Sequence, residues 1–217
     1  MNELKEILIF YSEMGAEFLH LPEKDPRADL AELNRQILQC HQCRLHESKT
    51  HYVPGEGGSR PDIIFIGEGP GQTEDQFGRP FIGNAGQLLD KIIDKMGYHR
   101  EDVFIGNVVK CRPPNNREPL PDEVQACLPY LLRQIELLAP RVIVCLGRVA
   151  LNNLLGTSHT MGRIRGQQLS FNRIPVIATY HPSYILHKKE KEEISQAKRE
   201  VWEDMQKVLS LIAGQRH

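Results

Sequence analysis

The chain has 217 residues, of which 40% are hydrophobic, and its 27 basic and 28 acidic residues leave a formal net charge of −1. This length suffices for one sizeable core but not for a second full domain, and the balanced charge gives no overall attraction to a polyanion. No run approaches about eighteen apolar residues, and the N-terminus lacks the features of a signal peptide. We therefore expect a cytoplasmic protein that does not enter a membrane.

The N-terminal residues predict an accessory helix. Leu4, Ile7 and Leu8 recur at helical spacing, and a segment rich in proline and charge follows them. We expect residues 1–26 to form this accessory element and residues 27–217 to form the main domain.

The main domain is predicted to alternate strands with helices. Strands are expected over residues 62–67, 103–109, 141–146 and 176–180, and helices over 28–38, 85–96, 122–138, 148–155 and from 188 onward. Short, almost wholly apolar strands are typical of a parallel sheet that helices cover on both faces. The predicted fold class is α/β, a three-layer α/β/α sandwich around a central four-stranded parallel sheet. Residues 161–166 combine turn residues with two arginines and predict a surface hairpin.

Four of the five cysteines form two groups, Cys40 with Cys43 and Cys111 with Cys127. Four thiolates from separated positions suit either a tetrahedral zinc ion or an iron-sulfur cluster, because sulfur ligands hold both. In a reducing compartment such cysteines indicate metal ligands or buried thiols before disulfides. Cys145 lies within an apolar strand, which favours a buried thiol.

Polar residues and glycines follow three of the four predicted strands. The first strand runs into residues 67–71, the second ends in Asn107 and runs into residues 110–115, and the last ends at residues 181–183. Ligands of an open parallel sheet bind beyond the carboxyl ends of its strands. Each residue alone is more often a turn or cap residue, but together they predict one site. The glycine-rich turn does not match a dinucleotide fingerprint, because Gln72 stands where glycine or alanine is needed.

Several short motifs therefore occur together: the two cysteine pairs, GEGPG at 67–71 with an acidic pair at 74–75, GRPF at 78–81, NVVKCRPP at 107–114 and HPS at 181–183. From about Cys40 to Leu186 the chain resembles the family 4, or iron-sulfur, uracil-DNA glycosylases. The resemblance implies a monofunctional repair enzyme that flips uracil out of DNA, hydrolyses its N-glycosidic bond and leaves an abasic site. It also implies a [4Fe-4S] cluster near the edge of the sheet, held by Cys40, Cys43, Cys111 and Cys127.

The resemblance assigns roles in the pocket. Phe81 would stack on the flipped base, and the Asn107 amide would pair with O4 and N3 of uracil, a donor and acceptor order that cytosine reverses. Glu74 would lie at the 5-methyl edge and exclude thymine. His181 and the backbone N–H of Gly69 would stabilise the negative charge that develops on O2.

The hydrolytic water has a less obvious partner. The better-known uracil glycosylases carry an aspartate where this chain has Gly69, so we expect Glu68 to handle the water and to be catalytic together with His181. Loop cations would neutralise DNA phosphates, and residues at the start of the last motif would contact the strand. These DNA-binding candidates are Lys110, Arg112, Arg117, Arg163, Arg165, Ser183 and Tyr184.

Residues 184–186 predict either an apolar wedge that enters the base stack or the start of a buried helix. Family members often carry a cation soon after the last motif, whereas His187 and then Lys188 stand here. The cluster is expected to act as a structural staple for the loop after Asn107.

Three functions compete. The first is the glycosylase, acting on uracil-containing DNA, single- or double-stranded, as a monomer; no lysine is placed as a Schiff-base nucleophile. The second is a non-catalytic or covalently trapping uracil-DNA binding protein, which residues 161–166 disfavour because they lack the histidine of the covalent branch. The third is a zinc-stabilised nucleotide-binding protein, which the absence of a phosphate-binding GxxxxGK[ST] motif disfavours.

Overall fold

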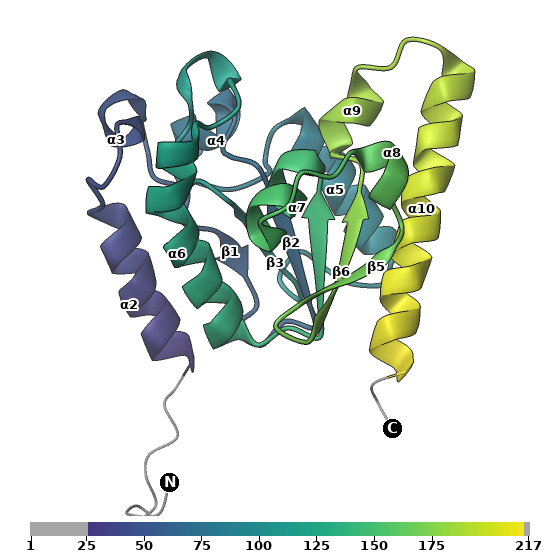
Figure 1. Ribbon diagram of the computed structural model, residues 1–217, viewed down its shortest axis with the longest axis horizontal. Coiled ribbons are helices and arrows are strands. Elements are labelled where there is room, and N and C mark those ends of the chain that lie inside the picture. Colours follow the sequence, from purple (N-terminus) through teal and green to yellow (C-terminus); the bar gives the residue numbers. More distant parts are fainter. Residues whose placement is uncertain (1–25, 215–217) are drawn as a thin grey trace, which may run out of the picture.

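The computed structural model describes residues 26–214, so the predicted N-terminal accessory helix lies outside the described residues. One sheet of six strands runs through the molecule in the order β1-β3-β2-β4-β6-β5 (Figure 1). The strands are β1 (Glu56–Gly57), β2 (Ile63–Gly67), β3 (Phe104–Asn107), β4 (Val142–Leu146), β5 (Gln168–Phe171) and β6 (Ile174–Thr179).

The inner strands β3, β2, β4 and β6 are parallel, and each edge strand is antiparallel to its neighbour. The prediction of four strands was therefore incomplete. It missed β1, which has two residues, and β5, whose residues alternate between exposed and half-buried.

The α-helices are α2 (Pro26–Leu38), α3 (Leu45–Ser48), α4 (Gln72–Phe77), α5 (Asn84–Lys95), α6 (Pro121–Leu138), α7 (Arg148–Leu155), α8 (Met161–Ile164), α9 (Pro182–Leu186) and α10 (Lys191–Gly214). A 3-10 turn spans Pro114–Asn116. The hairpin predicted over residues 161–166 is wrong, because α8 occupies most of that segment. No helix of residues 26–214 is both long and apolar enough to cross a membrane.

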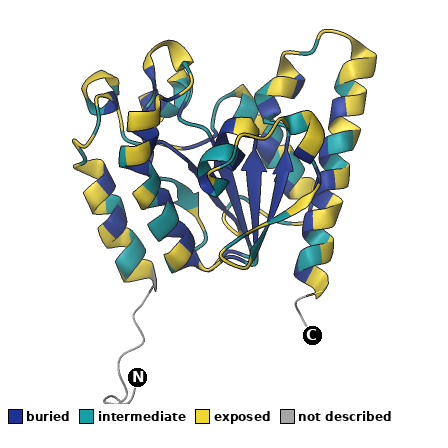
Figure 2. Ribbon diagram, in the orientation of Figure 1, coloured by how far each residue is buried: buried dark blue, intermediate teal, exposed yellow. Residues whose placement is uncertain are grey.

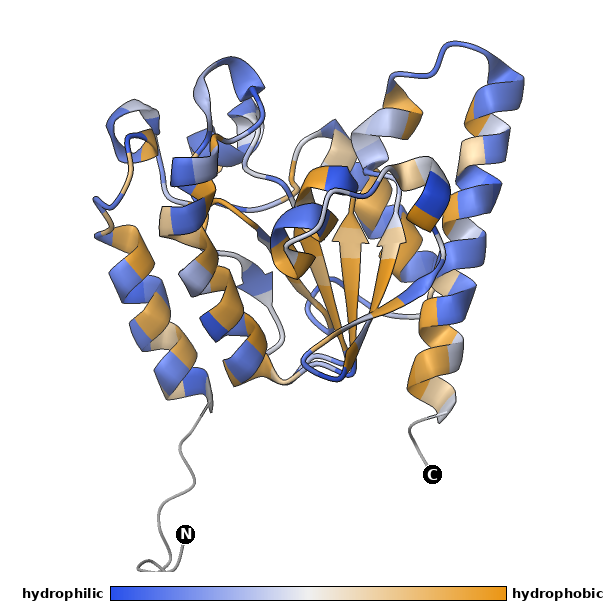
Figure 3. Cartoon of the chain, in the orientation of Figure 1, coloured by the Kyte–Doolittle hydropathy of each residue, from blue (hydrophilic) through white to orange (hydrophobic). Residues whose placement is uncertain are grey.

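Successive residues of β2 face opposite sides of the sheet, which creates two apolar layers. Ile64 and Ile66 pack in a core cluster with residues of α6 and α7, whereas Ile63 and Phe65 pack in a second cluster with residues of α5 and α10. The central strands are buried and hydrophobic throughout, and the helices turn polar faces to solvent (Figures 2 and 3). Burial on both faces explains why these strands read as continuous apolar runs.

Candidate active site

A cavity of about 450 Å³ opens at the carboxyl ends of the parallel strands. It brings together eight of the predicted site residues: Glu68, Gly69, Glu74, Phe81, Asn107, Arg117, His181 and Ser183. These residues come from the segments that follow β2 and β6, from the end of β3 and the loop after it, and from the loop before α5. The strand-end rule therefore predicted which residues meet, although they lie more than a hundred positions apart in the sequence.

Asn107 ends β3 and lies at the wall of this cavity with 1% of its surface exposed. Among residues 26–214, neither the oxygen nor the nitrogen of its side-chain amide has a hydrogen-bond partner. Gly67 makes this position possible, because a β-carbon there would lie 2.4 Å from Asn107 Oδ1 and 2.5 Å from the Phe81 ring. A buried amide with both functions unpaired is costly to the fold, which indicates a site that awaits a ligand with a matching donor and acceptor.

Phe81 and His181 form an aromatic corner of the cavity. Their ring centroids are 5.5 Å apart and the planes are inclined by 37°. Phe81 is 6% exposed and belongs to the core cluster on the α5 side of the sheet, so its ring is fixed from behind. The corner offers a flat apolar surface next to the unpaired amide of Asn107.

The hydrogen bonds of His181 define its tautomer. The backbone N–H of Ser183 donates to Nδ1 over 3.2 Å, and the Ser183 hydroxyl lies 2.5 Å from the same nitrogen. Since Nδ1 accepts, the ring proton of the neutral form is on Nε2. Burial lowers the pKa of His181 to about 4, so the imidazole is neutral at physiological pH and donates through Nε2–H.

Glu68 lies beside the cavity in a partly desolvated position. Burial raises the pKa of its carboxyl group, the nearby Glu118 raises it further, and Arg148 opposes both effects. A carboxylate with a raised pKa is a better proton acceptor than an ordinary surface glutamate.

Glu74 has a structural task that the sequence did not reveal. Its Oε1 accepts hydrogen bonds from the backbone N–H groups of Ile82, over 2.9 Å, and Gly83, over 2.8 Å. The same side chain lines the cavity, so the predicted steric role against a 5-methyl group stays a prediction.

Arg148 is a pocket residue that the prediction missed. It is the first residue of α7, lines the cavity and forms an ion pair of 2.8 Å with Glu118. The signal was available, because Gly147 and Arg148 directly follow β4 as the other site residues follow their strands. Asn116 and His187 also line the cavity, and so does Arg117, whose guanidinium pairs with the buried carboxylate of Glu123.

Lys110 is not a surface cation. It is 1% exposed, and its ammonium donates to the backbone carbonyl of Asn107 over 2.9 Å and to Gln134 Oε1 over 2.7 Å. Among the described residues no carboxylate pairs with it, and burial lowers its pKa to about 8. The predicted contact between Lys110 and a DNA phosphate is therefore wrong, since the ammonium points into the protein.

The structure bears differently on each of the predicted arginine contacts with DNA. Arg165 is largely buried and donates to Asp204 Oδ1 and to the backbone carbonyl of Glu200, so its charge is neutralised by α10 and its predicted phosphate contact is not supported. Arg163 is exposed on α8 but does not line the cavity. Arg112 donates to Asn116, one of the cavity residues. Contacts of Arg112 and Arg163 with phosphates stay predictions.

The last motif forms the start of α9. Ser183 is engaged with His181, Tyr184 stacks on Tyr180 with centroids 4.4 Å apart, and Lys188 lies 4.9 Å from the Tyr184 ring centroid. Ile185 is buried in the core, which removes it from the proposed wedge, whereas Leu186 is 47% exposed. The buried helix start holds for Ile185, and an apolar wedge formed by its exposed neighbours stays a prediction.

Cys40, Cys43, Cys111 and Cys127 line one small cavity together with Tyr52 and Tyr130. The backbone N–H of Lys110 donates to the Cys127 sulfur over 3.2 Å, and burial raises the pKa of Cys111 to about 12 and that of Cys127 to about 11. Within residues 26–214 no three His, Cys, Asp or Glu side chains are close enough together to hold a single metal ion. The thiols instead surround a space, and this all-sulfur donor set fits an iron-sulfur cluster.

The comparisons with known proteins agree with this site. A family model described as the uracil DNA glycosylase superfamily matches residues 54–206. A type-4 uracil-DNA glycosylase of Archaeoglobus fulgidus is 47% identical over 167 residues, which cover 73% of this chain and 84% of the relative. The chain belongs to the uracil DNA glycosylase superfamily.

Within the superfamily the similarity favours the type-4 members. A type-4 uracil-DNA glycosylase of Thermotoga maritima is 44% identical over 189 residues, or 86% of this chain and 96% of the relative. A type-5 uracil-DNA glycosylase of Pyrobaculum aerophilum is 31% identical over 161 residues, which cover 64% of this chain and 70% of the relative. The resemblance predicted from the motifs is thus confirmed over most of the chain.

Proposed function

We propose that this protein is a monofunctional uracil-DNA glycosylase. The observation that carries the proposal is the Asn107 side chain, a buried amide whose donor and acceptor are unpaired among the described residues, set beside an aromatic ring in a cavity of about 450 Å³. The type-4 relatives are named as uracil-DNA glycosylases.

Base selection follows from the chemistry of the amide. Uracil offers an acceptor at O4 and a donor at N3, which match Asn107 Nδ2 and Oδ1, whereas cytosine reverses the order and would leave four groups mismatched. Burial makes this mismatch expensive, because a buried polar group without a partner loses its bond to water. Phe81 supplies the stacking surface for the extruded ring.

Bond cleavage leaves negative charge on the uracil and positive character on the sugar. The Nε2–H of neutral His181 and the backbone N–H of Gly69 are the donors that we assign to O2. A neutral donor that is already oriented by Ser183 stabilises this charge without first giving up a proton or turning in the pocket. A protonated histidine would cost more to keep in this desolvated position.

We assign the hydrolytic water to Glu68. Its raised pKa suits a group that holds the water by hydrogen bonding and accepts its proton as the bond to the sugar forms. Arg148 acts on the Glu68 charge: it lowers the pKa of this carboxyl group and so favours the ionised form.

We assign a [4Fe-4S] cluster to Cys40, Cys43, Cys111 and Cys127, in preference to zinc. When bound, it would supply a rigid cross-link between the N-terminal helices, the loop after β3 and α6. Lys110 supports this assignment, because a buried ammonium beside four thiols would balance the negative charge of a thiolate-held group. Its contact with the Asn107 carbonyl links this region to the base-reading residue.

The partner of this site is uracil-containing DNA, single- or double-stranded, and we propose a monomer. The candidates for phosphate contacts are Arg148, which lines the cavity, and Arg112, which donates to the lining residue Asn116.

The test is cleavage of a labelled oligonucleotide that carries one uracil, cytosine or thymine, scored after treatment with alkali. We expect abasic sites from uracil alone, in amounts that exceed the enzyme many times over. Product that stops at one per protein would instead identify the covalently trapping function, and tight binding without any product would identify a sensor of uracil.

A further inference from the structure

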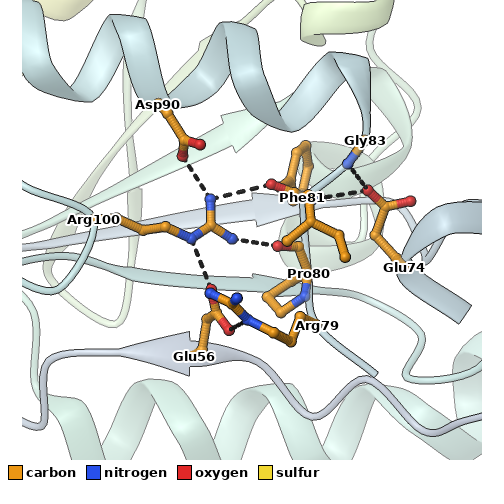
Figure 4. A network of polar contacts seen from close by, with 9 residues as sticks. Glu56, Glu74, Arg79, Pro80, Phe81, Gly83, Asp90 and Arg100 are labelled. Carbon is orange, nitrogen blue, oxygen red and sulfur yellow. Dashed lines mark hydrogen bonds and ion pairs between the residues drawn. The ribbon is translucent and has the colours of Figure 1, made fainter. Parts of the chain in front are cut away.

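The stacking residue Phe81 lies in a turn, residues 80–83, that two charged side chains bind from opposite sides (Figure 4). Arg100 Nη1 donates to the Phe81 carbonyl over 3.1 Å, and Nη2 donates to the Pro80 carbonyl. On the other side, Glu74 accepts the N–H groups of residues 82 and 83. Four successive residues of the turn are therefore held by charge-assisted hydrogen bonds.

The turn needs this support because Phe81 has a left-handed backbone, with φ of 49°. A residue with a β-carbon is strained in this region, and such strain persists only where the surroundings enforce it. The first turn of α5 packs on the same carbonyl, since a β-carbon at Gly86 would lie 1.8 Å from the Phe81 oxygen. The direction of the Phe81 ring thus depends on groups outside the cavity.

Arg100 is itself fixed by two carboxylates. Its Nε donates to Glu56 Oε1 over 2.7 Å, and Nη1 donates to Asp90 Oδ1 over 2.6 Å. Arg79 approaches Glu56 from the solvent side, with two bonds of 2.8 and 3.0 Å, and makes no bond to the turn carbonyls. The two arginines share one carboxylate, but Arg79 is 59% exposed and Arg100 is 22% exposed.

We propose that Arg100 is a positioning residue for base stacking: it holds the Pro80 and Phe81 carbonyls so that the Phe81 ring faces the flipped base. Arg100 does not line the cavity, so it acts through Phe81 and not by contact with the substrate. The inference rests on the proposed function, because it concerns how this pocket receives uracil.

The planar fork of arginine is what the turn requires. A lysine at position 100 would keep the positive charge between Glu56 and Asp90 but cannot donate to two adjacent carbonyls and two carboxylates at once. Arg100→Lys therefore removes the several directed N–H donors of the guanidinium but keeps the positive charge.

Two control variants are available in the chain. Arg79→Ala removes the other cation on Glu56 and leaves the bonds to the turn in place. Arg141→Ala removes a comparably buried arginine, 24% exposed, that donates to the Ile212 carbonyl far from the turn in sequence. The second control reports what loss of a buried arginine does to the fold in general.

The experiment measures binding of each variant to two oligonucleotides. One carries 2′-fluoro-2′-deoxyuridine, which resists excision because fluorine disfavours positive charge on the sugar, and the other carries a tetrahydrofuran abasic analogue, which has no base to stack. We expect Arg100→Lys to bind the fluorinated uridine roughly tenfold more weakly, as for loss of one base stack, with unchanged binding to the abasic analogue. Both controls should bind both oligonucleotides as the wild type does.

A double-mutant test shows whether the effect passes through the ring. In a Phe81→Leu background we expect Arg100→Lys to add nothing, because the stacking platform is already absent. Equal losses on both oligonucleotides, full binding by Arg100→Lys, or an undiminished effect in the Phe81→Leu background would each overturn the proposal. Since binding needs no turnover, a wild type that discriminates the two oligonucleotides but excises nothing would contradict the proposed function and leave this inference standing.

Discussion

Residues 107–111 connect the pocket at the strand ends to the cysteine cavity. The two regions differ in whether their polar groups have hydrogen-bond partners. In the pocket the Asn107 side-chain amide has no hydrogen-bond partner among the described residues. In the cysteine cavity both nitrogens of the neighbouring Lys110 have partners: the backbone N–H donates to Cys127 and the ammonium to two oxygens. A substrate pocket leaves polar atoms without hydrogen bonds until the substrate arrives, and this lowers the stability of the free protein. A site for a permanently bound group has polar neighbours that are already hydrogen-bonded within the fold.

The largest effect is expected at the cysteine cavity. We expect Cys127→Ala to lose the cluster and to lower the free energy of unfolding by about 2–5 kcal/mol, as for loss of a covalent cross-link of similar reach. Iron content, visible absorbance and thermal unfolding measure this. Cys145→Ala is the matched control, because Cys145 is buried in β4 and lies away from the other four thiols. Wild-type stability and activity in Cys127→Ala would remove the staple hypothesis.

Asn107→Ala should separate activity from stability. We expect excision of uracil to fall by about 10²–10³-fold, the range for loss of a preorganised polar group, while the midpoint of thermal unfolding stays the same or rises. The stability of Asn107→Ala would not fall, because the wild-type amide has no hydrogen bond to lose within the part of the chain that the structure describes. A large fall in the midpoint would show that the amide is part of the core and not a reader of bases.

The pH dependence should reflect the neutral state of His181. Its pKa in the folded protein, about 4, is below the ordinary value of 6.5, so the unfolded chain binds the extra proton first. This residue therefore costs stability increasingly as pH falls from 6.5 to 4, by at most about 3 kcal/mol. Nitrogen NMR of the imidazole and unfolding of His181→Gln across this range measure both effects. A His181 that titrates near 6.5 would contradict its assignment as a neutral donor.

The smallest effect is expected on the salt dependence of DNA binding. Arg112→Ala should reduce the slope of log affinity against log salt by about one, because one phosphate contact is lost. Arg165→Ala should leave the slope unchanged, since that guanidinium is paired with Asp204. Fluorescence anisotropy at several salt concentrations makes the comparison, and the opposite pattern would restore the original prediction for Arg165.

The sequence predicted the parts of the molecule that depend on local pattern. Apolar runs such as residues 63–66 identified the parallel strands, and the residues after those strands identified the pocket. The short edge strands carried no such pattern. Lys110 was misjudged because a lysine in a loop after a strand is usually exposed, and its partner Gln134 lies on a helix far along the chain. The contact between Arg100 and the Phe81 turn is likewise long-range, so no local motif marks it.

The most direct test of the account is the state of the Asn107 amide when the base is present. Protein with ¹⁵N-labelled asparagine, bound to the 2′-fluoro-2′-deoxyuridine oligonucleotide, should show the Asn107 side-chain amide protons shifted downfield as one of them donates to uracil O4. The abasic oligonucleotide should leave this resonance at its free position. A resonance that is the same in both complexes would contradict the claim that this buried, unpaired amide is what reads uracil.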